Sequence, residues 1–186
     1  MSLFFVACSQ EVKTQPKKSF TVGEEIHLKS VMGSEATLIR KEQGFVLKGN
    51  EDKIIMFDIF GTFCQPCKEE AAHLMDLQIK NADDVMLIGL DHLEEVSDAY
   101  IVDNFSGKYN AYYFITNSSQ NEQIVATILD DINYKPILQI PFKVVLKNGA
   151  YQLLTDIYEK NPANNFYLGK VPIPVMQTDL DVIKKK

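Results

Sequence analysis

An apolar run that passes directly into a cysteine pair and then into a helical pattern constrains this chain more than any other feature. Residues 52–60, DKIIMFDIF, contain a compact apolar run bounded by polar residues, which favours a strand covered on both faces. Residues 64–81, CQPCKEEAAHLMDLQIKN, are rich in helix-forming types and repeat apolar residues at helical spacing. The sequence therefore predicts that Cys64 lies where a buried strand meets the start of a helix.

Strands and helices are expected to alternate along the rest of the chain. The further candidates are strands at 24–30, 35–49 and 84–91, a helix at 93–107, a strand at 111–116, and helices at 118–134 and 174–186. Ser119 and Glu122 match a capping box at the start of the second of these helices. Asn148-Gly149 is a type I′ turn signal, which predicts a hairpin over 140–157. This alternation predicts an α/β fold with a central mixed β-sheet flanked by helices.

Length and charge narrow the possible functions. A chain of 186 residues suits one domain with a real core. The formal net charge of −6 argues against nucleic acid as a partner, because such a protein needs a basic face. The three lysines at the end of the chain are interpreted as a solvated terminus. After the first residues, no stretch approaches the ~18 apolar residues of a transmembrane helix.

The Cys-x-x-Cys spacing alone permits a metal site, a structural staple or a reactive thiol pair. Zinc would need two further ligands, and the remaining candidates, Cys8 and three separate histidines, are isolated in the sequence. A disulfide across two residues closes a very small loop and gains little in loop entropy. We therefore expect no metal and no cofactor other than a redox-active disulfide between Cys64 and Cys67.

A position at a helix start favours reactivity. The unpaired backbone N–H groups and the positive end of the helix dipole there stabilise a thiolate, and the thiolate is the form that attacks a disulfide. Pro66 fits one of the first helical positions, where its missing N–H costs nothing. A redox motif at Cys64 and Cys67 is the interpretation we favour.

Two acidic residues are candidates for proton exchange with Cys67. Asp58 lies inside the apolar run, where burial would raise its pKa; the alternative is an edge-strand side chain that faces water. Glu70 falls one helical turn beyond Cys67, although a solvent-facing glutamate is the default on any helix. Pro141 introduces a strand after Ile140, a placement that suggests a cis peptide in a tight bend.

Taken together, these residues resemble the thioredoxin superfamily and, within it, the TlpA/ResA-like periplasmic thioredoxins. The segment 61–70, GTFCQPCKEE, resembles the active-site signature of that branch, and 140–149, IPFKVVLKNG, resembles its cis-proline loop and hairpin. The resemblance runs from about Phe20 to the C-terminus. It implies a thioredoxin-like fold with an N-terminal strand or hairpin extension and an extra strand–helix insertion before the cis-proline. It gives no role to 158–175.

The resemblance also assigns roles by position. Cys64 matches the exposed attacking cysteine and Cys67 the resolving one. Asp58 matches the buried acid of thioredoxins and Glu70 the acid of ResA-like members, so that the proton acceptor is either of the two.

Four further residues match the substrate-binding surface of the family. Pro141 matches the cis-proline that faces the cysteine pair, and Ile140 matches the residue whose backbone pairs with a bound substrate strand. Phe63 replaces the usual tryptophan as an aromatic shelf, and Pro66 lies between the cysteines.

The resemblance implies thiol–disulfide exchange with protein substrates, in the direction of reduction. Gln65-Pro66 lacks the histidine that strongly oxidising members carry, which favours a reductase of exported proteins such as apocytochrome c. The alternatives are an oxidising or isomerising catalyst, a thiol peroxidase, and a non-catalytic binding module. The peroxidase motif Pro-x-x-x-Thr-x-x-Cys is not matched around Thr62.

The first residues suggest a location in the bacterial cell envelope. Phe5-Val6-Ala7-Cys8 resembles the end of a lipoprotein signal, which would make Cys8 the lipidation site; the alternative is an incidental thiol in a disordered arm. We expect residues 1–19 to be a truncated signal and disordered tether, and 20–186 to be the thioredoxin-like domain. The expected partners are protein thiols and disulfides, a membrane thiol electron donor, and the membrane itself through the lipid.

Overall fold

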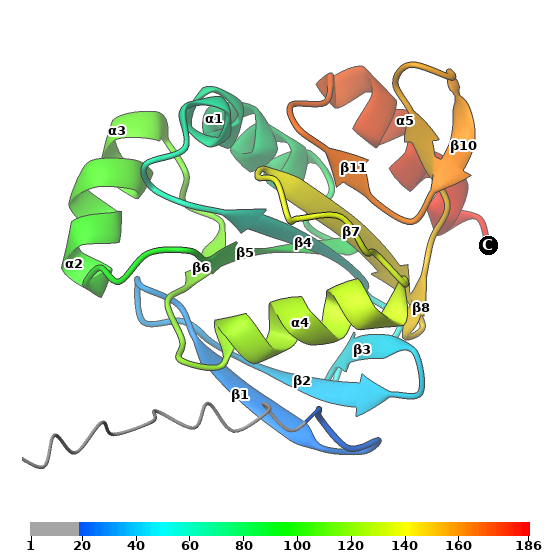
Figure 1. Ribbon diagram of the computed structural model, residues 1–186, viewed down its shortest axis with the longest axis horizontal. Helices are drawn as coiled ribbons and strands as arrows, with labels where there is room; N and C mark the ends of the chain where they lie inside the picture. The colour runs from blue at the N-terminus through cyan, green and yellow to red at the C-terminus, as the bar shows by residue number, and fades with distance from the viewer. Residues whose placement is uncertain (1–18) are drawn as a thin grey trace, which may run out of the picture.

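The computed structural model describes residues 19–186 of the chain. Cys8, the expected lipidation site, and all but the last residue of the expected tether over 1–19 lie outside the described residues. In the described part, one central sheet carries helices on both faces (Figure 1). The predicted α/β class with a mixed sheet is confirmed.

The central sheet has six strands (Figure 1). β4 (Ile54–Phe60) lies in its middle, parallel to β5 (Val85–Asp91) and antiparallel to β7 (Phe142–Lys147). The other strands are β6 (Phe114–Thr116), which pairs with β5, and β8 (Ala150–Tyr151) and β11 (Tyr167–Leu168), which both pair with β7. Every residue of β4 is buried, which confirms the prediction of a strand covered on both faces.

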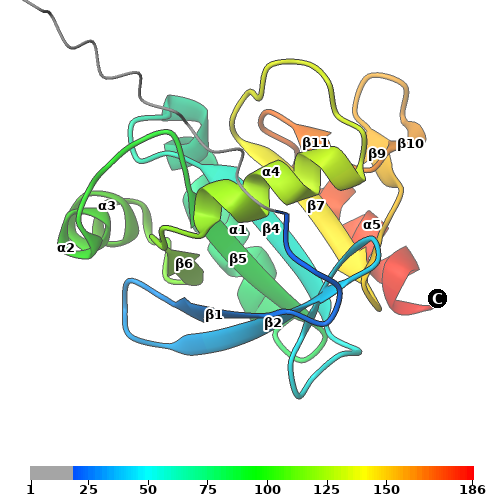
Figure 2. The same ribbon diagram turned by 60° about the horizontal axis from the view of Figure 1, so that its bottom comes forward.

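Alternate residues of β4 enter two separate cores. Met56 and Phe60 belong to the core under α1 (Gln65–Lys80) and α5 (Ile173–Lys184), because successive strand residues point to opposite faces. Ile55 and Phe57 belong to the core on the other face, which α4 and a small N-terminal sheet cover. The covering elements there are α4 (Asn121–Asp131), β1 (Glu25–Lys29), β2 (Glu35–Lys41) and β3 (Gly44–Leu47). Figure 2 shows α4 crossing in front of β4, β5 and β7.

A helical segment and β6 are inserted between β5 and α4. The helical segment consists of α2 (Asp98–Ile101), a π-helical turn η1 (Val102–Ser106) and α3 (Gly107–Tyr109). The predicted helix over 93–107 therefore starts later than expected. Ser97 caps it, since its hydroxyl accepts a hydrogen bond from the Tyr100 N–H at 3.1 Å, and the preceding residues form a loop.

The predicted capping box of Ser119 and Glu122 is wrong. α4 begins at Asn121, after Gln120 as its N-cap, and no side chain caps it. Instead, the Asn121 side-chain amide donates to the backbone oxygens of Asp91 and Thr116 at 2.9 and 2.8 Å. The start of α4 is thus set by contacts with the ends of β5 and β6, which lie far away in sequence and leave no local signal.

The predicted hairpin forms, but its second strand is short. Asn148 and Gly149 have φ of 53° and 79°, as a type I′ turn requires. β8 then pairs with β7 for only two residues, and the chain leaves to form β9 (Leu154–Asp156) and β10 (Asn161–Asn164). It returns as β11 at the other end of β7. The edge strand beside β7 is therefore split into two pieces.

Asp179 of α5 binds the segment that leaves the sheet after β8 and returns as β11, the β9–β10 excursion. Its carboxylate accepts from the backbone N–H and the hydroxyl of Thr155, both at 2.7 Å, and from the Tyr167 hydroxyl at 2.6 Å. The segment 158–175, which has no role in the sequence interpretation, thus supplies β10, β11 and the connection into α5.

A partly buried ion pair joins the N-terminal sheet to α4. The Arg40 guanidinium of β2 contacts both carboxylate oxygens of Asp131, at the end of α4, at 2.5 and 2.6 Å. The Tyr151 hydroxyl also donates to Asp131, at 2.9 Å. The three side chains tie together β2, α4 and β8, elements of three different parts of the chain.

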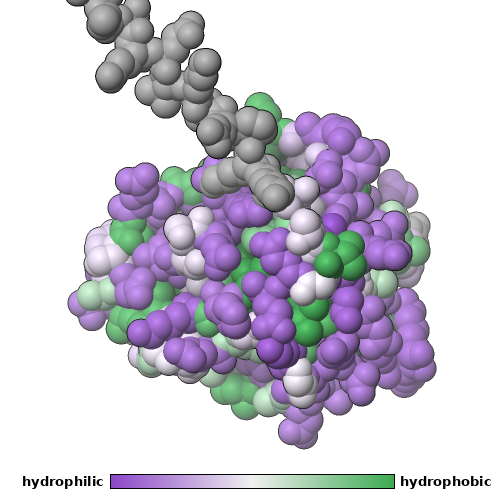
Figure 3. Space-filling view, turned by 90° about the horizontal axis from the view of Figure 1, so that it is seen from below, coloured by the Kyte–Doolittle hydropathy of each residue, from purple (hydrophilic) through white to green (hydrophobic). Residues whose placement is uncertain are grey.

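Within residues 19–186, none of the helices has the length and apolar character needed to cross a bilayer. The face in Figure 3 is mostly hydrophilic, and its apolar residues form small separate patches. Such scattered apolar residues are ordinary on a protein surface.

Candidate active site

Cys64 lies at the N-terminus of α1, as the sequence predicts. It is the N-cap residue, and its Sγ accepts a hydrogen bond from the Cys67 N–H at 3.3 Å. Pro66 occupies one of the first positions of the helix. The sulfur therefore accepts from a backbone N–H that has no partner within the helix, at the positive end of a 16-residue helix, where a thiolate is stabilised.

Cys64 and Cys67 form a disulfide. Cys64 is the more accessible of the two, with 7% of its surface exposed against 3% for Cys67, so the attacking cysteine is less exposed in this form than the resemblance implies. Phe63, immediately before it, is 57% exposed. A large exposed aromatic ring beside the accessible sulfur offers a shelf for an apolar side chain of a partner.

The chain segment before β7 lies against the disulfide. The Ile140–Pro141 peptide bond is cis, and the Ile140 carbonyl oxygen lies 3.8 Å from the Sγ of Cys64. Pro141 is buried and its own carbonyl accepts from the Gly169 N–H at 2.8 Å. The structure thus brings Phe63, Cys64 and Ile140, all candidate site residues, to one place at the end of the sheet.

Both candidate acids are buried on the face of the sheet that α1 covers. Asp58 is 2% exposed in the central strand β4, so the alternative of an edge-strand side chain facing water is wrong. Glu70 is also 2% exposed, and the default of a solvent-facing glutamate is wrong too. Burial raises the pKa of Asp58 to about 6, with a further contribution from the Glu70 charge, against the lowering effects of Lys143 and Tyr113.

Lys143 is the residue that the sequence interpretation missed. It is directly opposite Asp58 in the β4–β7 pair and is fully buried. Its Nζ lies 2.6 Å from Glu70 Oε2 and 3.8 Å from Asp58 Oδ1. The sequence did carry a signal for this pair. Asp58 is a lone charge in the apolar pattern of β4, Lys143 lies within the apolar pattern of β7, and these two strands pair in this fold.

Tyr113 completes the polar cluster. Its hydroxyl donates to Asp58 Oδ2 at 3.3 Å, and burial, together with the Asp58 charge, raises the pKa of Tyr113. Gly89 of β5 lies beside Asp58 and leaves space for the tyrosine ring, since a Cβ there would lie 3.0 Å from it. A glycine within the apolar run of β5 was a weak signal for this close approach.

A second acidic pair holds the loop before the cysteines. The Glu94 carboxylate accepts from the backbone N–H of Thr62 and from its hydroxyl, the latter at 2.7 Å. Asp91, at the end of β5, is 5% exposed and faces Glu94. Burial, followed by the interaction with Glu94, raises the pKa of Asp91 to about 8.

We expect Asp91→Asn to stabilise the protein at alkaline pH. Because the folded-state pKa of Asp91 lies above its unfolded value, the folded form binds more protons, and this contribution to stability is lost as pH rises toward 8. The unfolding free energy of the wild type should fall by about 2 kcal/mol more than that of the variant between pH 6 and 8. Urea unfolding at both pH values measures the two unfolding free energies. An equal fall in the wild type and the variant would contradict the prediction.

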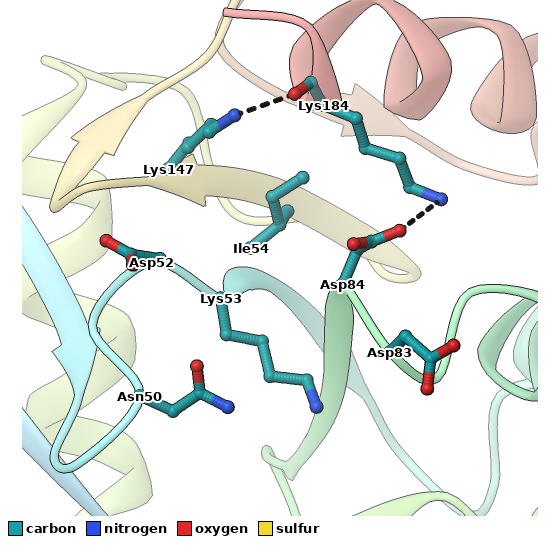
Figure 4. A pocket seen from close by; sticks show the side chains of 8 residues that line it. All are labelled: Asn50, Asp52, Lys53, Ile54, Asp83, Asp84, Lys147 and Lys184. Carbon is teal, nitrogen blue, oxygen red and sulfur yellow. Dashed lines mark hydrogen bonds and ion pairs between the residues drawn. The ribbon is translucent and has the colours of Figure 1, made fainter.

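A separate polar pocket lies at the opposite end of β4, and three of its charged residues, Lys147, Lys184 and Asp84, make contacts that stabilise the fold. Figure 4 shows Lys147 pointing to the backbone oxygen of Lys184, and the Lys184 side chain pointing to Asp84. Lys147 Nζ donates to the backbone oxygens of Ile183 and Lys184 at the C-terminus of α5, and Lys184 Nζ lies 3.0 Å from Asp84. Cations at a helix C-terminus stabilise it. Within residues 19–186, no group of three or more histidine, cysteine or acidic side chains is placed to hold a metal ion.

Comparison with solved structures identifies the fold. The chain is similar to a thiol:disulfide interchange protein of the thioredoxin family from Chlorobium tepidum, with a TM-score of 0.55 and 16% identity over 91% of this chain and 97% of that one. The fold is thioredoxin-like. StoA from Bacillus subtilis gives a TM-score of 0.54 and 14% identity, covering 86% of this chain and 98% of StoA.

A further structure with the thioredoxin-like fold is a secreted Mycobacterium tuberculosis disulfide oxidoreductase homologous to Escherichia coli DsbE. Its TM-score is 0.51 at 12% identity, covering 84% of this chain and 95% of that one. No protein-family model matches the chain, and no curated protein matches it in sequence. At these identities the likeness establishes the thioredoxin-like fold, and the chemistry has to be argued from the site.

Proposed function

We propose that this protein is a thiol–disulfide oxidoreductase that exchanges disulfides with other proteins through Cys64 and Cys67. The observation that carries the proposal is the disulfide at the start of α1. Its more accessible sulfur, that of Cys64, accepts a hydrogen bond from a backbone N–H of the helix. The apolar shelf of Phe63 and the backbone of Ile140 flank that sulfur. This arrangement supports attack on a partner disulfide that lies along Ile140.

The reaction starts from the reduced pair. The Cys64 thiolate attacks one sulfur of a partner disulfide, a mixed disulfide forms, and the other partner sulfur leaves as a thiolate that takes up a proton. Cys67 then loses its proton and attacks the Cys64 sulfur, which releases the second partner thiol and forms the Cys64–Cys67 disulfide. Two electrons pass to the partner, and a dithiol donor must reduce the pair again.

We propose Asp58 as the acceptor of the Cys67 proton. Glu70 is committed to Lys143 and to the Val171 N–H, which it accepts at 3.0 Å. Asp58 Oδ1 has no hydrogen-bond partner within the described residues and lies 3.8 Å from Lys143 Nζ, against 2.6 Å for Glu70 Oε2, so it is the more available of the two to receive a proton. With a pKa of about 6, Asp58 is ionised at neutral pH and weakly basic.

Asp58→Asn should slow the resolving step and leave the first attack unchanged. Asparagine cannot accept the proton, and we expect the release of partner thiol from the mixed disulfide to fall about 100-fold at pH 7. In the wild type this rate should rise through pH 6, as Asp58 ionises, and the variant should lack that rise. Rapid-quench measurement of mixed disulfide and released thiol separates the steps. Equal slowing of both steps would contradict a role specific to Cys67.

For the direction of exchange, we propose net reduction of exported proteins in the bacterial envelope, with Cys8 carrying a lipid anchor and a membrane thiol protein as the electron donor. Support comes from the sequence Gln65-Pro66 between the cysteines and from the lipoprotein-like start of the chain. Fractionation of native cells with fatty-acid labelling of Cys8 tests the location.

The reduction potential of the pair tests the function. Equilibration of the purified protein with dithiothreitol or glutathione buffers should give a value below about −250 mV for a reductase. A value near −120 mV would assign disulfide formation instead. A pair that does not equilibrate, together with no reduction of insulin, would leave a non-catalytic binding module as the function.

A further inference from the structure

The buried side of the cysteine pair holds a lysine between two carboxylates. Lys143 is 0% exposed, and its Nζ faces Glu70 Oε2 at 2.6 Å, Gly169 O at 3.5 Å and Asp58 Oδ1 at 3.8 Å. A fully buried ammonium is costly unless it is paired, and two carboxylates for one lysine leave the group with one negative charge in excess. That excess is relieved when one carboxyl takes up a proton.

One member of this cluster lies on the helix that begins at the cysteine pair, and the other two lie on the strands that this helix covers. Asp58 comes from β4 and Lys143 from the opposite position of β7, so the two side chains share the face of the sheet that α1 covers. Glu70 comes from α1, one turn beyond Cys67 on the same buried side of the helix. The position of Lys143 therefore links the strand acid to the helix that carries both cysteines.

From this geometry we propose that Lys143 is a positioning residue for disulfide exchange: it couples Asp58 and Glu70 into one unit that holds a single exchangeable proton next to Cys67. The inference rests on the proposed function. It assigns opposite effects to the two neighbours of Asp58. The Lys143 charge favours the ionised form of Asp58, and the Glu70 charge favours the protonated form.

The remaining groups around the unit fit this role. Tyr113 donates to Asp58 from the side of β6, and its raised pKa keeps it a neutral donor. Glu70 lines a crevice with His73, Lys170 and the segment 171–174, which brings solvent close to one end of the unit. Lys170 itself is at the surface, where it pairs with Glu69 at 2.8 Å. A proton that reaches the unit from Cys67 therefore has an outlet at the helix side.

The test measures the titration of Asp58 directly, in the oxidised protein, where no turnover is needed. Carboxyl ¹³C NMR, with the Asp58 signal assigned through Asp58→Asn, should give a midpoint near pH 6 in the wild type. Lys143→Met should raise the midpoint by about one pH unit or more, and Glu70→Gln should lower it. Lys170→Met, which removes a surface charge near the same glutamate, is the matched control and should leave the midpoint in place.

The pH profile of exchange provides the second readout. In Lys143→Met the rise in the rate of the resolving step should move to higher pH by the same amount as the NMR midpoint. For a shift of about one pH unit, the rate at pH 6.5 should fall about 3-fold. A lysine that served packing alone would lower the rate equally at every pH. An unchanged Asp58 midpoint in Lys143→Met would overturn the proposal.

Two further arms keep the result decisive. If Lys143→Met does not fold, Lys143→Met/Glu70→Gln removes the charges on both sides together, and its Asp58 midpoint should still lie above that of the wild type, because the lysine has the larger effect. A midpoint at or below the wild-type value would refute the coupling. If the wild type exchanges no disulfide, the proposed function fails, whereas the NMR titration still decides whether Lys143 couples the two acids.

Discussion

Replacing Cys64 with serine is expected to abolish the reduction of protein disulfides. A serine hydroxyl stays protonated at the start of α1 and cannot displace a thiolate, so the rate of insulin reduction should fall by roughly three orders of magnitude or more. The loss should be accompanied by little change in unfolding free energy once the wild type is reduced, because the N-cap position still holds a hydrogen-bond acceptor.

The partner cysteine and the third cysteine of the chain supply the comparison. Cys67→Ala should retain the first attack and accumulate a mixed disulfide with insulin, visible on a non-reducing gel. Cys8→Ser should react as the wild type does. A Cys64→Ser protein that still reduced insulin would show that the pair is not the reactive centre and would remove the basis of the proposed function.

Arg40→Met should be the most destabilising of the substitutions away from the cysteines. The substitution leaves the Asp131 carboxylate mostly shielded from water and removes the cation that pairs with it. An uncompensated charge at this partly solvated site should lower the unfolding free energy by about 3 kcal/mol. For a chain of this length that corresponds to a fall of about 6–12 °C in Tm. Calorimetry and urea unfolding measure the effect.

A matched pair on the same small sheet serves as the control. Lys48 and Glu25 lie 2.7 Å apart, but their side chains are 51% and 38% exposed, so Lys48→Met should cost less than about 0.5 kcal/mol. Arg40→Met/Asp131→Leu should recover much of the loss, because no charge remains buried. Equal costs for Arg40→Met and Lys48→Met would contradict the assignment of Arg40 as the anchor of the N-terminal sheet.

The centre of the fold and half of the site were predictable from sequence because their signals are local. The apolar run of β4, the cysteine spacing and the helical pattern of α1 lie next to one another in the chain, and so do the turn residues of the hairpin. Asp58 was found because a charge inside an apolar strand is conspicuous. Lys143 has the same property, and pairing the two required the strand order of the folded sheet.

What escaped prediction depends on contacts between distant segments. The start of α4 is set by the ends of two strands, and the clamp of Glu94 on Thr62 joins residues 32 positions apart. The break in the edge strand is fixed by Asp179, which lies in the last helix. Local patterns carry no information about such partners, and only the positions of the elements in the folded chain reveal them.

The divided edge beside β7 bears on how this protein behaves at high concentration. A long exposed edge strand offers a row of unpaired backbone groups on which a second chain can add as a new strand, the first step toward fibrils. Here that side carries only two short strands, separated by the β9–β10 excursion. At the opposite edge, β6 has three residues and is partly covered by Ser30 and Val31. Within residues 19–186, neither border of the central sheet offers a continuous template on which a second chain could add as a strand.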